Sequence, residues 1–96
     1  MAKSRPKLTG VRLRLYVAGA APNSLLAVAN AKAICARHFA GRHVLEIVDV
    51  IAHPLRALAD GVVVTPTLIK RWPRPLQRLI GNLAEEAVVL ATLVAR

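Results

Sequence analysis

Few side chains in this sequence have the spacing that catalysis or metal binding requires. Cys35 is the single cysteine, and one thiolate without a second sulfur cannot carry out thiol–disulfide exchange. The three histidines, His38, His43 and His53, form no helix-spaced pair that would hold a metal ion, so we predict that they lie on the surface. We therefore expect no metal site and no redox activity, and we expect Cys35 to be a buried, inert thiol.

A nucleophilic triad is the one catalytic grouping that the residue types allow on paper. Ser24, His53 and Asp49 supply the hydroxyl, the imidazole and the carboxylate. Such a triad is defined by geometry, and three common residues in a short chain are no evidence for one. No glycine-rich phosphate loop is present either. The sequence thus predicts a protein that is not an enzyme and that needs no cofactor.

Positive charge is the strongest chemical bias of the chain. Fourteen lysines and arginines stand against five acidic residues, which gives a net charge of +9 and favours polyanions or acidic protein surfaces as partners. Lys70, Arg71, Arg74 and Arg78 surround Trp72 and form the best nucleic-acid candidate. Because the chain has only three aromatic residues, a stacking platform is poorly supported. Nucleic acid is therefore an unlikely partner, kept as the alternative.

Length and composition predict one small domain with an aliphatic core. The chain has 96 residues with one Trp, one Tyr and one Phe, so Val, Leu, Ile and Ala must fill the interior. Residues 1–10 are predicted to be a basic N-terminal arm, and residues 11–96 a single domain. No signal segment opens the sequence, and no apolar run reaches the roughly 20 residues that a membrane span needs. We expect a cytoplasmic protein.

The first half of the domain has a clear strand–helix–strand pattern. Apolar and polar residues alternate over 11–18, which predicts a half-buried strand. A helix is expected over about 24–39, capped by Asn23 or Ser24. Its apolar face is predicted from helical spacing, and comprises Leu26, Ala29, Ala33 and Ala36. The β-branched run 44–51 predicts a second strand, parallel to the first across a right-handed crossover.

The second half gives more divided signals. A short helix is expected over 55–60 and extended structure over 62–64, 67–71 and 77–80, with a proline-rich turn at 72–75. Two glutamates favour a helix start at 85–86, whereas the residues that follow prefer strands. This order, β-α-β-α-β-β-α, predicts an α/β thioredoxin-like fold. Thr65-Pro66 stands where such folds carry a cis-proline, and a trans proline at a strand start is the alternative.

Several phrases of the sequence, taken in order, resemble those of the KaiB family of the bacterial circadian clock. The resemblance spans about residues 11–94. Its pieces are Leu-Tyr-Val-Ala-Gly at 15–19, Pro-Asn-Ser at 22–24, Val-Asp-Val at 48–50, Thr-Pro-Thr-Leu at 65–68 and Arg-Leu-Ile-Gly-Asn-Leu at 78–83. Each piece alone is weak, but their order and spacing are specific.

The resemblance implies a regulatory binding protein with two folds. The rare fold would be the thioredoxin-like one, which docks onto the ATPase KaiC, and the ground state would be βαββααβ and a dimer or tetramer. KaiA or a sensor histidine kinase would be further partners. Carried over to this chain, the partner-binding positions are Val44, Arg56 and Gly61. The region of the fold switch and its prolines comprises Thr65, Pro66, Pro73, Pro75 and Gly81.

The sequence also departs from the family pattern. Glu46 and Gly61 stand at positions that are basic in some members, Asn82 replaces the usual aspartate, and Arg74 interrupts the prolines. No acidic tail precedes Arg96. We therefore expect a KaiB-like protein that modulates circadian or stress signalling by docking onto a KaiC-type ATPase. The alternatives are a basic nucleic-acid-binding domain and a redox-inactive thioredoxin-like sensing module that partners a histidine kinase.

Overall fold

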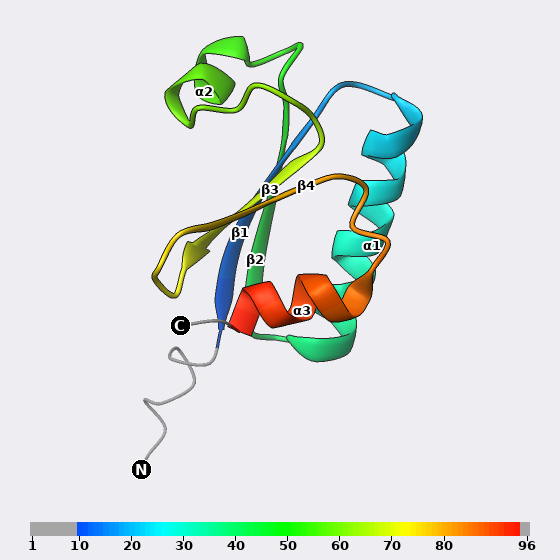
Figure 1. Ribbon diagram of the computed structural model, residues 1–96, viewed down its shortest axis with the longest axis vertical. Helices are drawn as coiled ribbons and strands as arrows, with labels where there is room; N and C mark the ends of the chain where they lie inside the picture. Colours follow the sequence, from blue (N-terminus) through cyan, green and yellow to red (C-terminus); the bar gives the residue numbers. More distant parts are fainter. Residues whose placement is uncertain (1–9, 95–96) are drawn as a thin grey trace.

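The computed structural model describes residues 10–94 and confirms the predicted order of elements (Figure 1). Most of the predicted arm lies outside the described residues, as do the last two residues of the chain. The elements are β1 (Val11–Val17), α1 (Pro22–His38), β2 (His43–Asp49), α2 (Pro54–Ala59), β3 (Thr67–Trp72), β4 (Gln77–Ile80) and α3 (Glu86–Val94).

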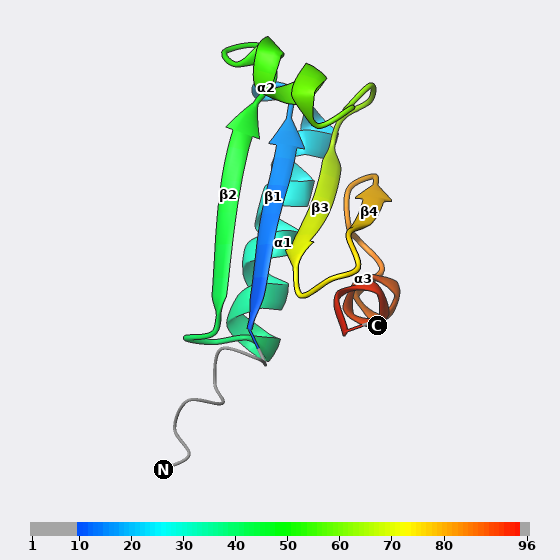
Figure 2. The same cartoon turned by 90° about the vertical axis from the view of Figure 1, so that its left-hand side faces the viewer.

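The strands form one mixed sheet in the order β2-β1-β3-β4 (Figure 2). The predicted parallel pair is present, with Val11 opposite His43. β3 runs antiparallel to both β1 and β4, and Leu15 of β1 lies opposite Leu68. β2 and β4 are therefore the two edges, and each has one side without a strand partner in the described chain.

The helices divide the sheet into a covered face and an open face. α1 and α3 lie on one side and α2 on the other, near the end of β1 (Figure 1). The alternation of β1 sends Val11, Leu13, Leu15 and Val17 into the main core with α1 and α3. On the other side, a smaller cluster of Tyr16, Val48, Ala57 and Ile69 anchors α2. Because α2 has only six residues, most of this open face is left without a covering helix.

Helix α1 starts earlier than predicted and without a side-chain cap. Pro22 occupies its first turn, where the missing N–H costs nothing, and Ala21 precedes it with no capping side chain. The expected caps were thus wrong. Ser24 is buried, and its hydroxyl accepts a hydrogen bond from the backbone N–H of Ala18 at 3.0 Å. The serine closes the turn from β1 into the helix.

The predicted apolar face of α1 was also wrong. Leu26, Ala29, Ala33 and Ala36 are exposed, and the buried residues are Ser24, Ala27, Ala31, Ile34 and Cys35. Helix α1 carries small apolar residues on nearly all of its sides, so their spacing in the sequence does not show which side faces the core. Packing against the sheet determines the buried side, because it places Ile34, which is larger than the neighbouring alanines, in the main core.

Residues 62–64 were expected to be extended but form no strand. Val62 packs against the cluster under α2, whereas Val63 is 90% exposed. A β-branched run becomes a strand only where it pairs with another strand, and residues 62–64 instead connect α2 to β3 without pairing. The predicted cis bond at Thr65-Pro66 is present, and the bonds before Pro73 and Pro75 are also cis.

Helix α3 forms despite its β-branched residues. Val89 and Leu93 are buried against the main core, and Glu86 lies in the first turn near the positive end of the helix dipole. The side chain of His38 in α1 contacts Glu86, with 2.7 Å between Nε2 and Oε2. His38 is therefore half-buried and paired, not simply a surface residue. Tertiary packing outweighs the local strand preference of this segment.

Replacing Leu93 by alanine tests how firmly α3 is packed. The side chain is 2% exposed, so Leu93→Ala should lower the free energy of unfolding by about 2–5 kcal/mol, because contacts are lost and a cavity is left. Urea unfolding followed by circular dichroism measures the change. Val94→Ala is the matched control, since exposed Val94 should change stability by about 0.5 kcal/mol or less. Equal losses in the two variants would contradict this packing.

Candidate functional site

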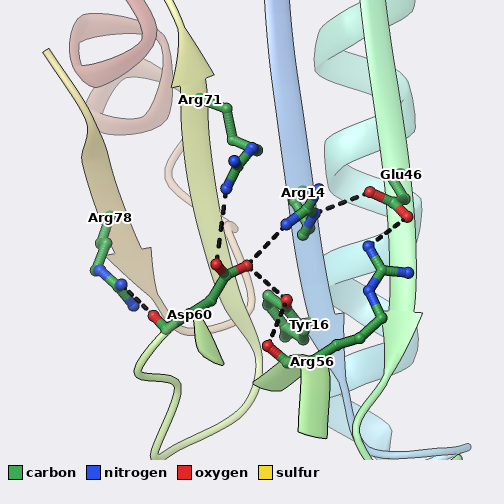
Figure 3. A network of polar contacts seen from close by, with 7 residues as sticks. All are labelled: Arg14, Tyr16, Glu46, Arg56, Asp60, Arg71 and Arg78. Carbon is green, nitrogen blue, oxygen red and sulfur yellow. Dashed lines mark hydrogen bonds and ion pairs between the residues drawn. The ribbon is translucent and has the colours of Figure 1, made fainter. Parts of the chain in front are cut away.

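A network of charged side chains occupies the open face of the sheet where α2 lies over it (Figure 3). Alternation in β1 and β2 turns these residues away from the main core, and the end of α2 supplies the second carboxylate. We call this set the open-face network. Its members are Arg14, Tyr16, Glu46, Arg56, Asp60, Arg71 and Arg78.

Arg14 is the centre of the open-face network because it contacts both carboxylates. Its Nε donates to Oε1 of Glu46 at 2.8 Å, and its Nη1 donates to Oδ2 of Asp60 at 2.9 Å. Burial disfavours the charge of Arg14, but the two carboxylates more than compensate and raise its pKa. One guanidinium on β1 therefore links the neighbouring strand to the end of α2.

Tyr16 gives the network a second link between β1 and α2. Its phenol oxygen lies 2.6 Å from Oδ2 of Asp60 and 3.0 Å from the backbone carbonyl of Arg56. A phenol has one proton to donate, and the charged, closer carboxylate is the stronger acceptor. The ring is fully buried in the cluster under α2, so this hydrogen bond is partly shielded from water.

The remaining arginines surround the two carboxylates. Arg56 of α2 donates to Oε2 of Glu46 at 2.6 Å, and Arg71 of β3 lies 3.7 Å from Oδ1 of Asp60. Arg78 of β4 donates to the backbone carbonyl of Asp60. All four strands thus contribute to one cluster in which four arginines surround two carboxylates, and the excess of charge is positive.

Ionisation in the network is fixed well away from neutral pH. Desolvation opposes the charge of Asp60, but hydrogen bonds from Tyr16 and Arg14 outweigh it and lower the pKa of Asp60. The pKa of Glu46 is lowered mainly by its hydrogen bond with Arg56. Burial raises the pKa of Tyr16, and Asp60 adds to the effect. Groups held in one protonation state suit positioning and recognition better than proton transfer.

The structure brings the predicted partner-binding residues to this side of the molecule. Val44 lies two residues before Glu46 on the same face of edge strand β2, and it is 58% exposed. Arg56 is a member of the open-face network. Gly61 follows α2 with φ at +68°, a backbone conformation that strains most other residues. The three positions flank the β2 edge and the two ends of α2.

The predicted fold-switch region falls into two groups at opposite ends of the β3–β4 hairpin. Thr65 and buried Pro66 precede β3, and the backbone N–H of Gly81 donates to the carbonyl of Pro66 at 3.0 Å. Pro73 and Pro75 lie in the turn that joins β3 to β4. The structure therefore joins Pro66 with Gly81 and separates both from the other two prolines.

The predicted basic cluster around Trp72 does not assemble. Lys70 lies opposite Leu13 on the covered face, where it is 1% exposed and desolvation lowers its pKa. Arg71 and Arg78 turn to the open face and contact Asp60. The prediction was wrong because strand alternation sends neighbouring residues to opposite faces. Arg74 stays exposed in the hairpin turn.

The other chemical candidates have structural roles. Asp49 Oδ1 accepts hydrogen bonds from the backbone N–H groups of Gly19 and Ile51, and so shapes a turn. Cys35 is buried as predicted, and burial raises the pKa of its thiol. Within residues 10–94, no three His, Cys, Asp or Glu side chains gather as metal ligands. No helix in the same range is long and apolar enough to cross a membrane.

Comparison with known proteins identifies the family. The family model of the KaiB domain matches residues 14–94. The chain belongs to the KaiB family. The circadian clock protein KaiB3 of Synechocystis is 43% identical to it over 81 residues, which cover 84% of this chain and 79% of that protein. The circadian clock oscillator protein KaiB of Synechococcus elongatus is 42% identical over 81 residues, with the same coverage.

Solved structures confirm the thioredoxin-like fold of this KaiB-family chain. The N-terminal domain of SasA from Synechococcus elongatus has a TM-score of 0.71 and 27% identity, covering 88% of this chain and 83% of that domain. A thioredoxin variant from Halobacterium salinarum has a TM-score of 0.72 at 16% identity, covering 97% of this chain and 82% of that one. The second likeness concerns the fold alone.

The family resemblance pointed to Arg56, and the basic cluster around Trp72 included Arg71 and Arg78, but no reasoning from the sequence predicted that these residues form the open-face network. The alternation of β1 already placed Arg14 and Tyr16 on the polar side of a strand, which was the available signal. Asp60 was predicted only as the end of a short helix. Its contact with Arg14 joins residues 46 positions apart, and no local pattern reports such a pair.

Asp60→Asn should make the protein less stable at neutral pH and less sensitive to acid. Because the folded pKa of Asp60 is lowered, its stabilisation is complete above the unfolded pKa of about 3.9 and is lost as pH falls through the folded value. We expect a loss of about 1–3 kcal/mol at pH 7, since Arg14 and Tyr16 lose a partner. The two proteins should converge in stability in acid.

Urea unfolding between pH 7 and pH 2 measures this difference. Glu85→Gln is the control, because it removes one negative charge from an exposed position. Its stability should stay within about 0.5 kcal/mol of that of the parent protein at every pH, because Glu85 contributes only an exposed charge near the start of α3. A constant gap between parent and Asp60→Asn over the whole range would contradict the assigned role of Asp60.

Proposed function

We propose that this KaiB-family protein acts by docking onto a KaiC-type ATPase and thereby modulates circadian or stress signalling. Family membership supports a clock regulatory role, and the match over residues 14–94 is the observation that carries the proposal. The relatives are named as circadian clock proteins, not as enzymes. The protein would therefore act without catalysis, in the cytoplasm.

The proposed docking surface consists of the β2 edge and α2. An edge strand offers unpaired backbone groups to a partner, and the exposed Val44 lies on that strand. Exposed apolar side chains continue the surface beyond β2, namely Ile51, Leu55 and Leu58, which are between 71% and 77% exposed. Apolar exposure of this extent is typical of a surface that binds another protein. The open-face network would hold α2 in place for docking through Arg14 and Tyr16.

We also propose that docking depends on a change of fold after about residue 51. Two segments support this because their local preference opposes the structure they adopt. The run 62–64 prefers a strand but forms none, and α3 contains Val88, Val89 and Thr92, which also favour strands. In the βαββααβ ground state, such segments would find strand partners. If the docking-competent fold is the minor one, apparent affinity falls by its populated fraction.

The same proposal includes the free state and further partners. The free protein would be a dimer or tetramer. KaiA or a sensor histidine kinase would be a further partner of the protein. Likeness to the N-terminal domain of SasA, at 27% identity, supports a role close to that domain. A redox-inactive sensing module is therefore the second candidate, and it would differ in acting as the partner of a histidine kinase.

The decisive experiment is size-exclusion chromatography with light scattering on the full chain and a purified KaiC-type ATPase, sampled over hours. A complex that grows slowly would support docking after a change of fold, and the free protein's mass gives its oligomeric state. A complex that is complete at the first sample would support docking but contradict the slow switch. Absence of a complex would overturn the proposal.

Val44→Glu should weaken that complex by about tenfold or more, because a carboxylate would replace an apolar contact on the docking edge. Ile80→Glu is the matched control. Ile80 is also β-branched, lies on the opposite edge strand β4 and is 69% exposed. Dissociation constants of both variants are compared after circular dichroism has verified their fold. Equal weakening would show that the β2 edge is not the docking site.

A further inference from the structure

A pocket of about 670 Å³ lies at the end of the sheet away from α2. The start of β1, the turn into β2 and the end of β3 line this open pocket. Its lining residues are Gly10, Val11, Arg12, Gly41, Arg42, His43, Val44, Arg71 and Trp72. The pocket includes two residues of the cluster predicted around Trp72, and the fold replaces the others with Arg12 and Arg42.

The pocket is strongly cationic. Three arginines and one histidine line it, and its lining contains no carboxylate. Arg12 is exposed, and no ion pair among residues 10–94 involves it. Arg71 is only weakly held, since its nearest carboxylate oxygen, on Asp60, is 3.7 Å away. The guanidinium of Arg42 lies over the ring of Phe39 and donates to the backbone carbonyl of His38, so Arg12 and Arg71 are the cations that we consider for a ligand. A guanidinium matches phosphate in both charge and geometry.

Trp72 gives the pocket a flat aromatic wall. It lies opposite Arg12 across the β1–β3 pair, and it is 40% exposed. A tryptophan ring that remains accessible among arginines suits a ligand with its own planar ring, because stacking stabilises such a pair by about 1–3 kcal/mol. A bare phosphate would not use this wall, and an acidic peptide would seldom do so. The Trp72 ring and the arginines together favour a ligand in which a phosphate is joined to a nucleotide base.

We propose that this pocket binds a nucleotide unit, with its phosphate at Arg12 and Arg71 and its base stacked on Trp72. The unit could belong to a free nucleotide or to single-stranded nucleic acid, and the net charge of +9 favours the polymer. This binding would require no partner protein and no change of fold, so it can be tested apart from docking, although the pocket shares Val44 with the docking surface and Arg71 with the open-face network.

Trp72 is the single tryptophan of the chain, so its fluorescence reports on this pocket alone. The full-length protein is titrated with AMP, with a single-stranded 12-nucleotide oligoadenylate and with inorganic phosphate at about 100 mM salt, where distant charges are screened. We expect quenching that saturates with AMP or the oligonucleotide. Saturation by the oligonucleotide alone would assign the polymer as ligand, and equal saturation by AMP would assign the free nucleotide.

Variants separate the pocket from general surface charge. Arg12→Ala should weaken binding by about tenfold or more, whereas Lys32→Ala, which removes one positive charge from the exposed side of α1, should leave it unchanged. Trp72→Ala, followed by anisotropy of a labelled oligonucleotide or AMP, should weaken binding by a similar factor. Circular dichroism verifies that each variant is folded.

Three results would overturn the proposal. The first is the absence of saturable quenching by either nucleotide ligand. The second is an equal loss of affinity in Arg12→Ala and Lys32→Ala, which would mean that total charge alone attracts the ligand. The third is inorganic phosphate that binds as tightly as AMP, because the base and Trp72 would then contribute nothing.

Discussion

The bridge that Arg14 makes between Glu46 and Asp60 is the contact on which the open side of this molecule depends. In the described part of the chain, the covered side has two helices and a continuous apolar core, whereas the open side has a six-residue helix over one end of the sheet. A helix this short is not stable by itself, so its position must come from tertiary contacts. Those contacts include a small apolar cluster, the hydrogen bonds of Asp60 with Arg14 and Tyr16, and the ion pair of Arg56 with Glu46.

The partly buried setting makes this bridge stronger than an ordinary surface ion pair. The side chains of Arg14 and Asp60 are 21% and 20% exposed, so water screens their attraction only in part. Each carboxylate also has more than one donor, which offsets the cost of removing it from water. The helix α2 nevertheless has few buried apolar contacts, and elements with few such contacts unfold locally more easily than those in a core. A second half that can be released in this way is what the proposed change of fold requires.

Most of the fold could be predicted from local pattern, because the decisive signals were local. Alternation in 11–17 and the β-branched run after residue 43 were enough for the parallel pair. The cis bond at Thr65-Pro66 was expected from its place in a thioredoxin-like fold, since the residues alone also allowed a trans proline. The failures occurred where two faces of an element look alike in sequence. Leu26 and Ile34 of α1 are equally apolar, and only the position of the sheet selects Ile34 for the core.

The site could be predicted only in part, since its residues meet through the topology. Arg56 came from the resemblance to the KaiB family, but its partner Glu46 was noted only as a departure from the family pattern. In the structure that departure has a physical role, because Glu46 binds both Arg56 and Arg14. The charge of Glu46 is therefore compensated within this chain by neighbouring arginines.

The distribution of the few carboxylates explains why the two ends of the open face differ. Glu46 and Asp60 lie beside α2, and none lines the pocket at the other end. Arg71 belongs to both regions, since it lines the pocket and makes the longest contact of Asp60, at 3.7 Å. An anion bound in the pocket would compete with Asp60 for this side chain. Because such coupling is reciprocal, the state of α2 and the affinity of the pocket would influence each other through Arg71.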